Sequence, residues 1–69
     1  MANINKRLGD KIKKLRKKAG FSQEQLALSA KIDLTSVNEI ETGHRNPSLR
    51  TIHKIALALK VEIKDLLDF

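Results

Sequence analysis

Two short helices separated by a tight turn, predicted for residues 23–42, constrain the fold of this chain more than any other feature of its sequence. Ser22 is followed three residues later by Gln25, which is the spacing of a capping box, and a helix is expected from Gln23 to Ala30. The segment Lys31-Ile32-Asp33 is then expected to form a tight turn. The chain is therefore expected to pack one helix across another within 20 residues.

The second helix of this pair carries an unusual number of polar residues. Asp33 can cap it, and it is expected to run from Leu34 to Thr42 and to end at Gly43 in the left-handed conformation. Only Val37 and Ile40 plainly point inward. The other face carries Leu34, Thr35, Asn38, Glu39 and Thr42. Such a face is unusual for a helix that only supports a core.

Three further helices are predicted from apolar residues that recur at helical spacing. A first helix, from about Asn5 to Ala19, has an apolar stripe formed by Ile4, Leu8, Ile12, Leu15 and Ala19. A fourth helix is capped by Ser48 and reaches about residue 59, with a stripe formed by Leu49, Ile52, Ile55, Ala56 and Leu59. A short fifth helix near the C-terminus contains Val61, Ile63, Leu66 and Leu67.

The composition favours a single compact all-α domain that spans residues 1–69. Ten leucines and seven isoleucines can build its core, whereas aromatic residues make up only 3% of the chain. A deep active site is hard to build in so small a domain, so we do not expect an enzyme. The absence of cysteine excludes disulfide scaffolds and zinc sites with thiolate ligands. His44 and His53 lack companion ligands at zinc spacing, and neither a metal, a cofactor nor a small-molecule ligand is expected.

No segment of the sequence is suited to a membrane or to export. No apolar run approaches the ~18 residues that a transmembrane helix needs. The first residues, MANINKRLGD, lack the apolar region of a secretory signal peptide. A cytoplasmic location is expected by elimination.

The positive charge is concentrated at one end of the chain. Residues 1–20 contain eight lysines and arginines but only one acidic residue, Asp10, whereas residues 21–69 contain six basic and seven acidic residues. A run of basic residues can be a solvated helix face, or it can contact a polyanion such as nucleic acid or an anionic membrane. A core of five capped helices argues against a helix that lies on a membrane.

Together, residues 23–42 and the basic first helix favour a helix-turn-helix motif. In that motif one helix crosses the DNA backbone while the next enters the major groove. A structural αα-hairpin with the same spacing is the alternative. The exposed polar face of the second helix and the capping box favour the DNA-binding interpretation.

Three sequence motifs extend this interpretation to a family. The pieces SQEQLA, IETG and RNPSL begin at Ser22, Ile40 and Arg45. Together they resemble the Cro/C1-type (XRE family) helix-turn-helix domain of phage repressors and Cro proteins, and most closely the small controller proteins of restriction–modification systems. The resemblance covers about residues 8–67. It implies a compact five-helix, lambda-repressor-like fold and a sequence-specific transcriptional regulator that binds a palindromic operator in double-stranded DNA as a homodimer.

The resemblance also assigns expected DNA contacts. The recognition helix would be residues 34–42, and the residues at base edges would be Leu34, Thr35, Asn38 and Glu39. Asparagine can pair with adenine and glutamate can accept from the N4 amino group of cytosine. Glu39 can instead be solvated, or can orient a neighbouring basic side chain. The residues expected at phosphates are Gln23, Thr42, His44, Arg45, Asn46, Lys17 and Lys18.

Two further expectations concern structure. In similar repressors an arginine and a glutamate at the positions of Arg16 and Glu41 form a partly buried pair, so Arg16 is expected to orient the recognition helix. The family usually has glycine where this chain has Lys31. Either Lys31 adopts the left-handed conformation, at a cost of roughly 1 kcal/mol, or the turn differs slightly.

The C-terminal part of the chain is free for a protein partner. A two-fold homodimer through Leu57, Val61 and Phe69 is expected, with the recognition helices about 34 Å apart. The alternative is an antitoxin or adaptor that binds a different protein through residues 53–69. The operator sequence, the regulated genes and the choice between repression and activation cannot be read from the residues.

Overall fold

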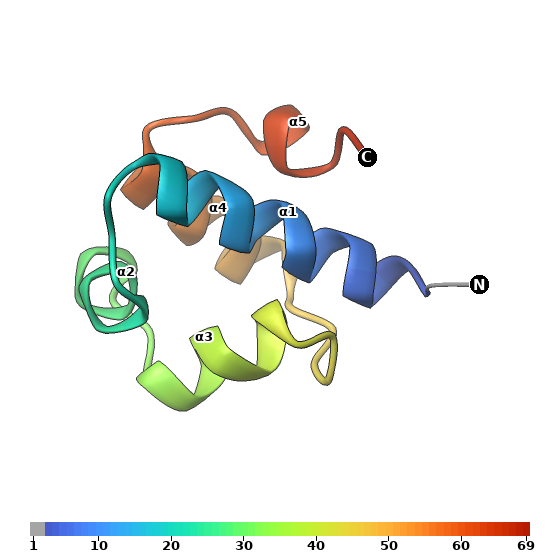
Figure 1. The fold of residues 1–69 in the computed structure, drawn as a ribbon, viewed down its shortest axis with the longest axis horizontal. Helices are drawn as coiled ribbons and strands as arrows, with labels where there is room; N and C mark the ends of the chain where they lie inside the picture. The colour runs from blue at the N-terminus through green and yellow to red at the C-terminus, as the bar shows by residue number, and fades with distance from the viewer. Residues whose placement is uncertain (1–2) are drawn as a thin grey trace.

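A computed structural model describes residues 3–69 and has an all-α architecture, as the sequence predicts (Figure 1). Helix α1 crosses the middle of the view, α3 lies on one side of it, and α5 lies on the other. The helices are α1 (Ile4–Lys18), α2 (Gln23–Ala30), α3 (Leu34–Glu41), α4 (Leu49–Leu59) and α5 (Ile63–Leu66).

The helix starts follow the capping residues. The side chain of Ser22 accepts from the backbone N–H of Gln25, and the Gln25 side chain accepts from the backbone N–H of Ser22, which completes the predicted capping box. Asp33 and Ser48 cap α3 and α4 as expected. The cap of α1 is Asn3, whose side chain accepts from Lys6, so α1 begins at Ile4, one residue earlier than the sequence suggested.

All four longer helices end in a left-handed residue, and two of these residues are lysines. Gly20 and Gly43 have φ of +81°, whereas Lys31 and Lys60 have φ of 59° and 58°. After α2, the N–H of Ile32 bonds to the carbonyl oxygen of Ala27 in a Schellman motif. Lys31 therefore adopts the strained left-handed conformation, which is the first of the two alternatives expected for this turn.

The core is aliphatic and receives side chains from every helix. Its largest fully buried members are Ile12, Leu26, Val37, Ile40, Ile55 and Leu66. Burial of side chains of this size is the main favourable term in folding. Phe21 and Ile32, from the two turns that flank α2, pack against this core and are partly buried.

Three residues expected on the apolar stripes lie outside the core. Ile4 and Leu49 each keep 69% of their surface exposed, and Ala19 is exposed as well. Ile4 and Leu49 are the first residues of α1 and α4, and Ala19 is the C-cap of α1. The periodicity continued to the helix ends, but the packing of neighbouring helices does not extend that far.

Helices α1 and α3 approach closely at Gly9, a residue that the sequence analysis did not single out. A Cβ atom added at Gly9 would lie 2.2 Å from the carbonyl oxygen of Ile40 and 2.7 Å from that of Glu41. No side chain fits at these distances, so the close crossing requires glycine. This contact fixes the C-terminal half of α3 against α1.

Candidate nucleic-acid interface

Helix α3 presents one polar face to solvent and buries the other. Leu34, Thr35 and Asn38 are exposed, and the Glu39 side chain is 39% exposed, whereas Val37 and Ile40 are each 1% exposed. The residues expected at base edges therefore share the exposed side of one helix. The helix ends at Glu41, and Thr42 is its C-cap, one residue short of the expected boundary.

A buried ion pair locks the C-terminal end of α3 to α1. Nε of Arg16 donates to Oε2 of Glu41 at 2.6 Å, and Nη2 donates to Oε1 at 3.1 Å. The Arg16 and Glu41 side chains are 8% and 2% exposed. Nη1 of Arg16 also donates to the carbonyl oxygen of Phe21. A two-pronged pair with extra hydrogen bonds is the geometry in which buried charges are tolerated.

Gln23 belongs to the same network, which the sequence analysis missed. Its side-chain amide donates to Oε1 of Glu41 at 3.1 Å. The first residue of α2 is therefore tied to the last residue of α3, and both are tied to α1 through Arg16. Gln23 was expected at a DNA phosphate, and in the free protein its amide already has a protein partner. No unpaired buried side-chain nitrogen or oxygen is present within residues 3–69.

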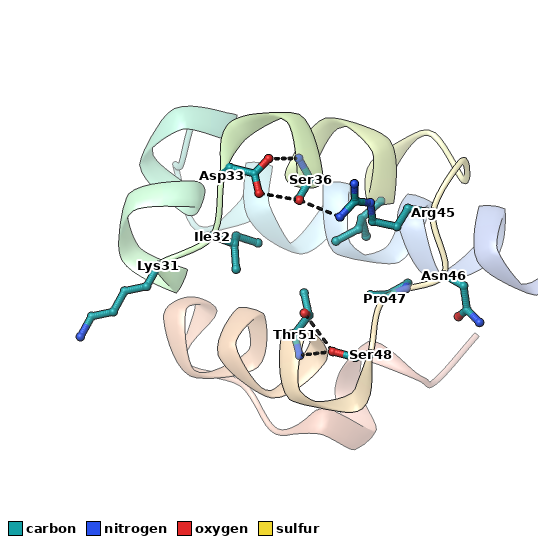
Figure 2. Close-up of a pocket in the computed structure, with 10 residues that line it drawn as sticks. Lys31, Ile32, Asp33, Ser36, Arg45, Asn46, Pro47, Ser48 and Thr51 are labelled. Carbon is teal, nitrogen blue, oxygen red and sulfur yellow. Dashed lines mark hydrogen bonds between the residues drawn. The ribbon is translucent and has the colours of Figure 1, made fainter.

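A second ion pair lies on the exposed flank of α3. Nη2 of Arg45 donates to Oε1 of Glu39 at 2.6 Å, and Nη1 donates to Oγ of Ser36 at 2.9 Å. Oγ of Ser36 in turn donates to Oδ1 of Asp33 at 2.7 Å. Figure 2 shows Asp33, Ser36 and Arg45 as a continuous row along α3. The loop after α3 is thus tied back to the helix through a side chain.

The hydrogen bonds from Ser36 also change the acidity of Asp33. Its side chain accepts from the hydroxyl and from the backbone N–H of Ser36, and these bonds hold the pKa of Asp33 below its usual value of 3.8. Arg45 contributes in the same direction. The carboxylate form is favoured because both hydrogen bonds require an acceptor.

The other loop residues are exposed. The hydroxyl of Thr42 donates to the carbonyl oxygen of Asn38 at 3.0 Å, and Nδ1 of His44 lies 2.8 Å from the same hydroxyl. Asn46 is exposed, and Pro47 is buried behind it. Thr42, His44, Arg45 and Asn46 therefore follow one another along the end of α3 and the adjoining loop.

Lys17 and Lys18 lie apart from this cluster. Both are exposed in the last turn of α1, and within residues 3–69 neither forms a hydrogen bond or ion pair with α3. Among the described residues, the structure therefore shows no contact that joins these two lysines to α3.

The three residues expected at a dimer interface have different surroundings. Leu57 is 66% exposed on α4. Val61 is half-buried against the core. The ring of Phe69 lies under the guanidinium of Arg7, 5.2 Å from ring centre to Cζ, and its carbonyl oxygen accepts from the same side chain. Of the three, Leu57 is the most accessible.

Metal and membrane sites receive no support in the described part of the chain. Residues 3–69 contain no group of three or more His, Cys, Asp or Glu side chains that could hold a metal ion. None of the helices formed by these residues is both long enough and apolar enough to span a bilayer.

Comparison with known proteins places the chain in a family. Residues 12–66 match the HTH_3 helix-turn-helix family. The chain is 46% identical over 68 residues to the control protein C.BamHI of Bacillus amyloliquefaciens, covering 97% of this chain and 84% of that protein. It is 42% identical over 67 residues to the control protein C.MunI of a Mycoplasma species, covering 96% and 90%.

A solved structure agrees with these relatives. The restriction–modification controller protein C.AhdI of Aeromonas hydrophila superimposes with a TM-score of 0.89 at 39% identity, covering 90% of this chain and 94% of that one. The chain therefore belongs to the HTH_3 (Cro/C1-type) helix-turn-helix family and is a DNA-binding transcriptional regulator, not an enzyme.

Proposed function

We propose that this protein is a restriction–modification controller protein that binds a palindromic operator as a homodimer. The observation that carries the proposal is the construction of α3, which is clamped to the core through Glu41 and leaves its opposite face polar and exposed. The similarity to two control proteins over nearly the whole of each chain supports the same conclusion. Operator binding would place its action in the cytoplasm.

In this proposal α3 enters the major groove and its exposed side chains contact base edges. Thr35, Asn38 and Glu39 would contact base edges, and Leu34 would lie beside them as the first residue of the helix. Asn38 has the amide needed for a two-pronged contact with adenine, and Leu34 can contact a thymine methyl group. These contacts would decide which sequences are bound.

Phosphate contacts would come from the residues around α3. Thr42, His44 and Asn46 lie at the end of the helix and in the following loop, and Lys17 and Lys18 add positive charge at the end of α1. Gln23 is at the first position of α2, where free backbone N–H groups favour an anion. Such contacts would set the register on DNA without selecting the sequence.

Dimerisation would use the C-terminal half of the chain. Leu57 offers an apolar side chain on α4 for a two-fold contact, which Val61 and Phe69 would complete. A two-fold axis there would place the two α3 helices about 34 Å apart, one turn of DNA. Sedimentation of Leu57→Glu tests this arrangement, with Leu28→Glu on α2, where the leucine is 80% exposed against 66% for Leu57, as the control. Dissociation of the first variant alone supports the interface, whereas equal behaviour of both contradicts it.

Selection of bound sequences from a random duplex library, near physiological salt, tests the function itself. The proposal predicts a palindrome whose half-site centres are one helical turn apart. Binding without an enriched sequence would reduce the protein to a non-specific basic binder. A complete absence of binding would favour an adaptor or antitoxin that uses residues 53–69 for a protein partner.

A further inference from the structure

The exposed ion pair between Glu39 and Arg45 places a carboxylate on the polar side of α3. In the proposed function the polar side of α3 meets DNA, where phosphates repel a carboxylate, yet Glu39 lies part-exposed on the flank of that side. We propose that Glu39 reads a cytosine through its N4 amino group, and that Arg45 is a positioning residue that holds Glu39 for this contact. This inference rests on the proposed function.

The two oxygens of Glu39 have different surroundings. Oε1 accepts from Nη2 of Arg45 at 2.6 Å. Oε2 has no hydrogen-bond donor among residues 3–69. The side chain is therefore fixed by one oxygen and keeps the other free to accept a hydrogen bond. The guanidinium also neutralises the carboxylate, which lowers the electrostatic cost of bringing it close to DNA.

Arg45 is itself held in place from behind. Its second nitrogen, Nη1, donates to the hydroxyl of Ser36, a residue that is only 6% exposed. Ser36 is fixed in turn by Asp33, the cap of α3. A planar guanidinium with two anchors on one helix has little freedom to turn outward toward a phosphate. This arrangement favours a positioning role for Arg45 over the phosphate contact first expected of it.

The chemistry of the major groove selects the base. A free carboxylate oxygen needs a donor, and only the amino groups of cytosine and adenine provide one there. Adenine presents its N7 acceptor beside the amino group, which suits an amide such as that of Asn38 better than a carboxylate. Guanine and thymine present acceptors at the corresponding positions. Cytosine is therefore the base that fits Glu39.

The first test starts from the operator that the wild-type protein selects. If no operator is selected, the proposed function fails before this inference is reached. With an operator in hand, the affinities of Glu39→Gln, Arg45→Gln and the double variant are measured against duplexes changed one base pair at a time. Lys64→Gln, which removes one positive charge from α5 as Arg45→Gln does from the loop after α3, is the matched control for Arg45→Gln.

The wild-type protein and the control are expected to bind about 5- to 150-fold more weakly when one particular C·G pair in each half-site becomes T·A. Both Glu39→Gln and Arg45→Gln should lose the preference for the C·G pair. The double variant should discriminate between the two base pairs no less than either single variant does. If Arg45→Gln instead weakens binding equally on all sequences and keeps the cytosine preference, Arg45 contacts phosphate and the inference is wrong. Retention of the preference by Glu39→Gln would also overturn it.

A second test changes only the DNA. In a paired N4-methylcytosine the methyl group replaces the hydrogen that faces the major groove, whereas 5-methylcytosine keeps that hydrogen. N4-methylcytosine should weaken DNA binding by the wild-type protein strongly, and 5-methylcytosine should weaken it much less. Glu39→Gln should bind DNA that contains N4-methylcytosine or cytosine with the same affinity. Equal sensitivity to both bases would contradict the inference. Replacing the opposite guanine by 7-deazaguanine, which lacks the N7 acceptor, should have little effect on affinity. A loss of affinity would mean that Arg45 contacts guanine directly.

Discussion

Helix α3 contributes the glutamates of two arginine–glutamate pairs that have the same chemistry and opposite environments. Arg16 and Glu41 are almost completely buried, with side chains 8% and 2% exposed, and a carbonyl oxygen and a glutamine amide complete their hydrogen bonds. Arg45 and Glu39 are 47% and 39% exposed and face solvent. Both pairs have an N···O distance of 2.6 Å. Distance alone therefore cannot assign a role to an ion pair.

The difference in burial assigns different roles to the two pairs. Removing one partner of a buried pair leaves a charge that neither water nor protein compensates, so the buried pair governs stability. An exposed pair contributes little to stability because water solvates either partner alone. In the proposed function the exposed pair is therefore free to serve DNA recognition, whereas the buried pair fixes the position of α3 against α1.

The largest expected effect comes from breaking the buried pair. Glu41→Gln leaves the Arg16 guanidinium buried without its counter-charge and should lower the free energy of unfolding by about 3–5 kcal/mol. Urea unfolding followed by circular dichroism measures this change. If the variant does not fold at all, replacing both Arg16 and Glu41 by apolar residues of similar size should restore folding. A loss below about 1 kcal/mol would contradict this prediction, because the pair would then contribute no more than an exposed ion pair does.

The next effect tests the crossing that brings the buried pair together. Gly9→Ala places a methyl group against the carbonyl oxygens of Ile40 and Glu41, so α1 and α3 must separate, at a cost of about 1–3 kcal/mol or more. Gly20→Ala is the matched control, because no atom lies within 4 Å of its added Cβ and only its φ of +81° opposes the change, at a cost of about 1 kcal/mol. Thermal unfolding compares the two. Equal losses would mean that the close approach at Gly9 is not required.

A smaller effect is expected in the turn before α3. Lys31→Gly relieves the left-handed strain at φ 59° but makes the unfolded chain more flexible, and the net change should lie between zero and about 1 kcal/mol of stabilisation. Lys60→Gly, at a residue with φ of 58°, should change the free energy of unfolding by a similar amount. Lys60 belongs to neither ion pair. Urea unfolding of the two variants measures the effect. A clear destabilisation by Lys31→Gly alone would contradict the account of the turn.

The smallest effect concerns acid sensitivity on the exposed side. The pKa of Asp33 is lower in the folded protein than its usual value of 3.8, because Ser36 donates two hydrogen bonds to the carboxylate. Its stabilising contribution is therefore complete above about pH 4 and is lost as the pH falls through the lowered pKa. Asp33→Asn should remove this part of the acid sensitivity. Melting temperatures from pH 2 to 6 test the prediction, and a constant difference between the two proteins over that range would contradict it.

Local features of this fold could be predicted from the sequence, because they depend on residues a few positions apart. The capping box of Ser22 and Gln25, the caps Asp33 and Ser48, and the periodicity of buried residues are of this kind. Lys31 in a left-handed turn was one of two alternatives, and only the structure chose between them.

The rest depends on residues that are distant in sequence. Nothing in the sequence near Gly9 indicates that the carbonyl oxygens of α3 approach it, and nothing near Gln23 indicates its hydrogen bond with Glu41. The contact of Arg7 with Phe69 joins residues 62 positions apart. The spacing of Asp33 and Ser36 signals a helix cap, but the attachment of Arg45 to Ser36 depends on how the loop folds back. Tertiary packing creates each of these contacts.

The claim that the buried pair governs stability and the exposed pair does not is tested most directly by measuring the free energies of unfolding of Glu39→Gln and Glu41→Gln side by side. Each variant removes one carboxylate from the same helix and from an ion pair of the same length. We expect a loss below about 0.5 kcal/mol for Glu39→Gln and a loss of about 3 kcal/mol or more for Glu41→Gln. Equal losses for the two variants would contradict the claim, because the exposed pair would then be a second structural clamp.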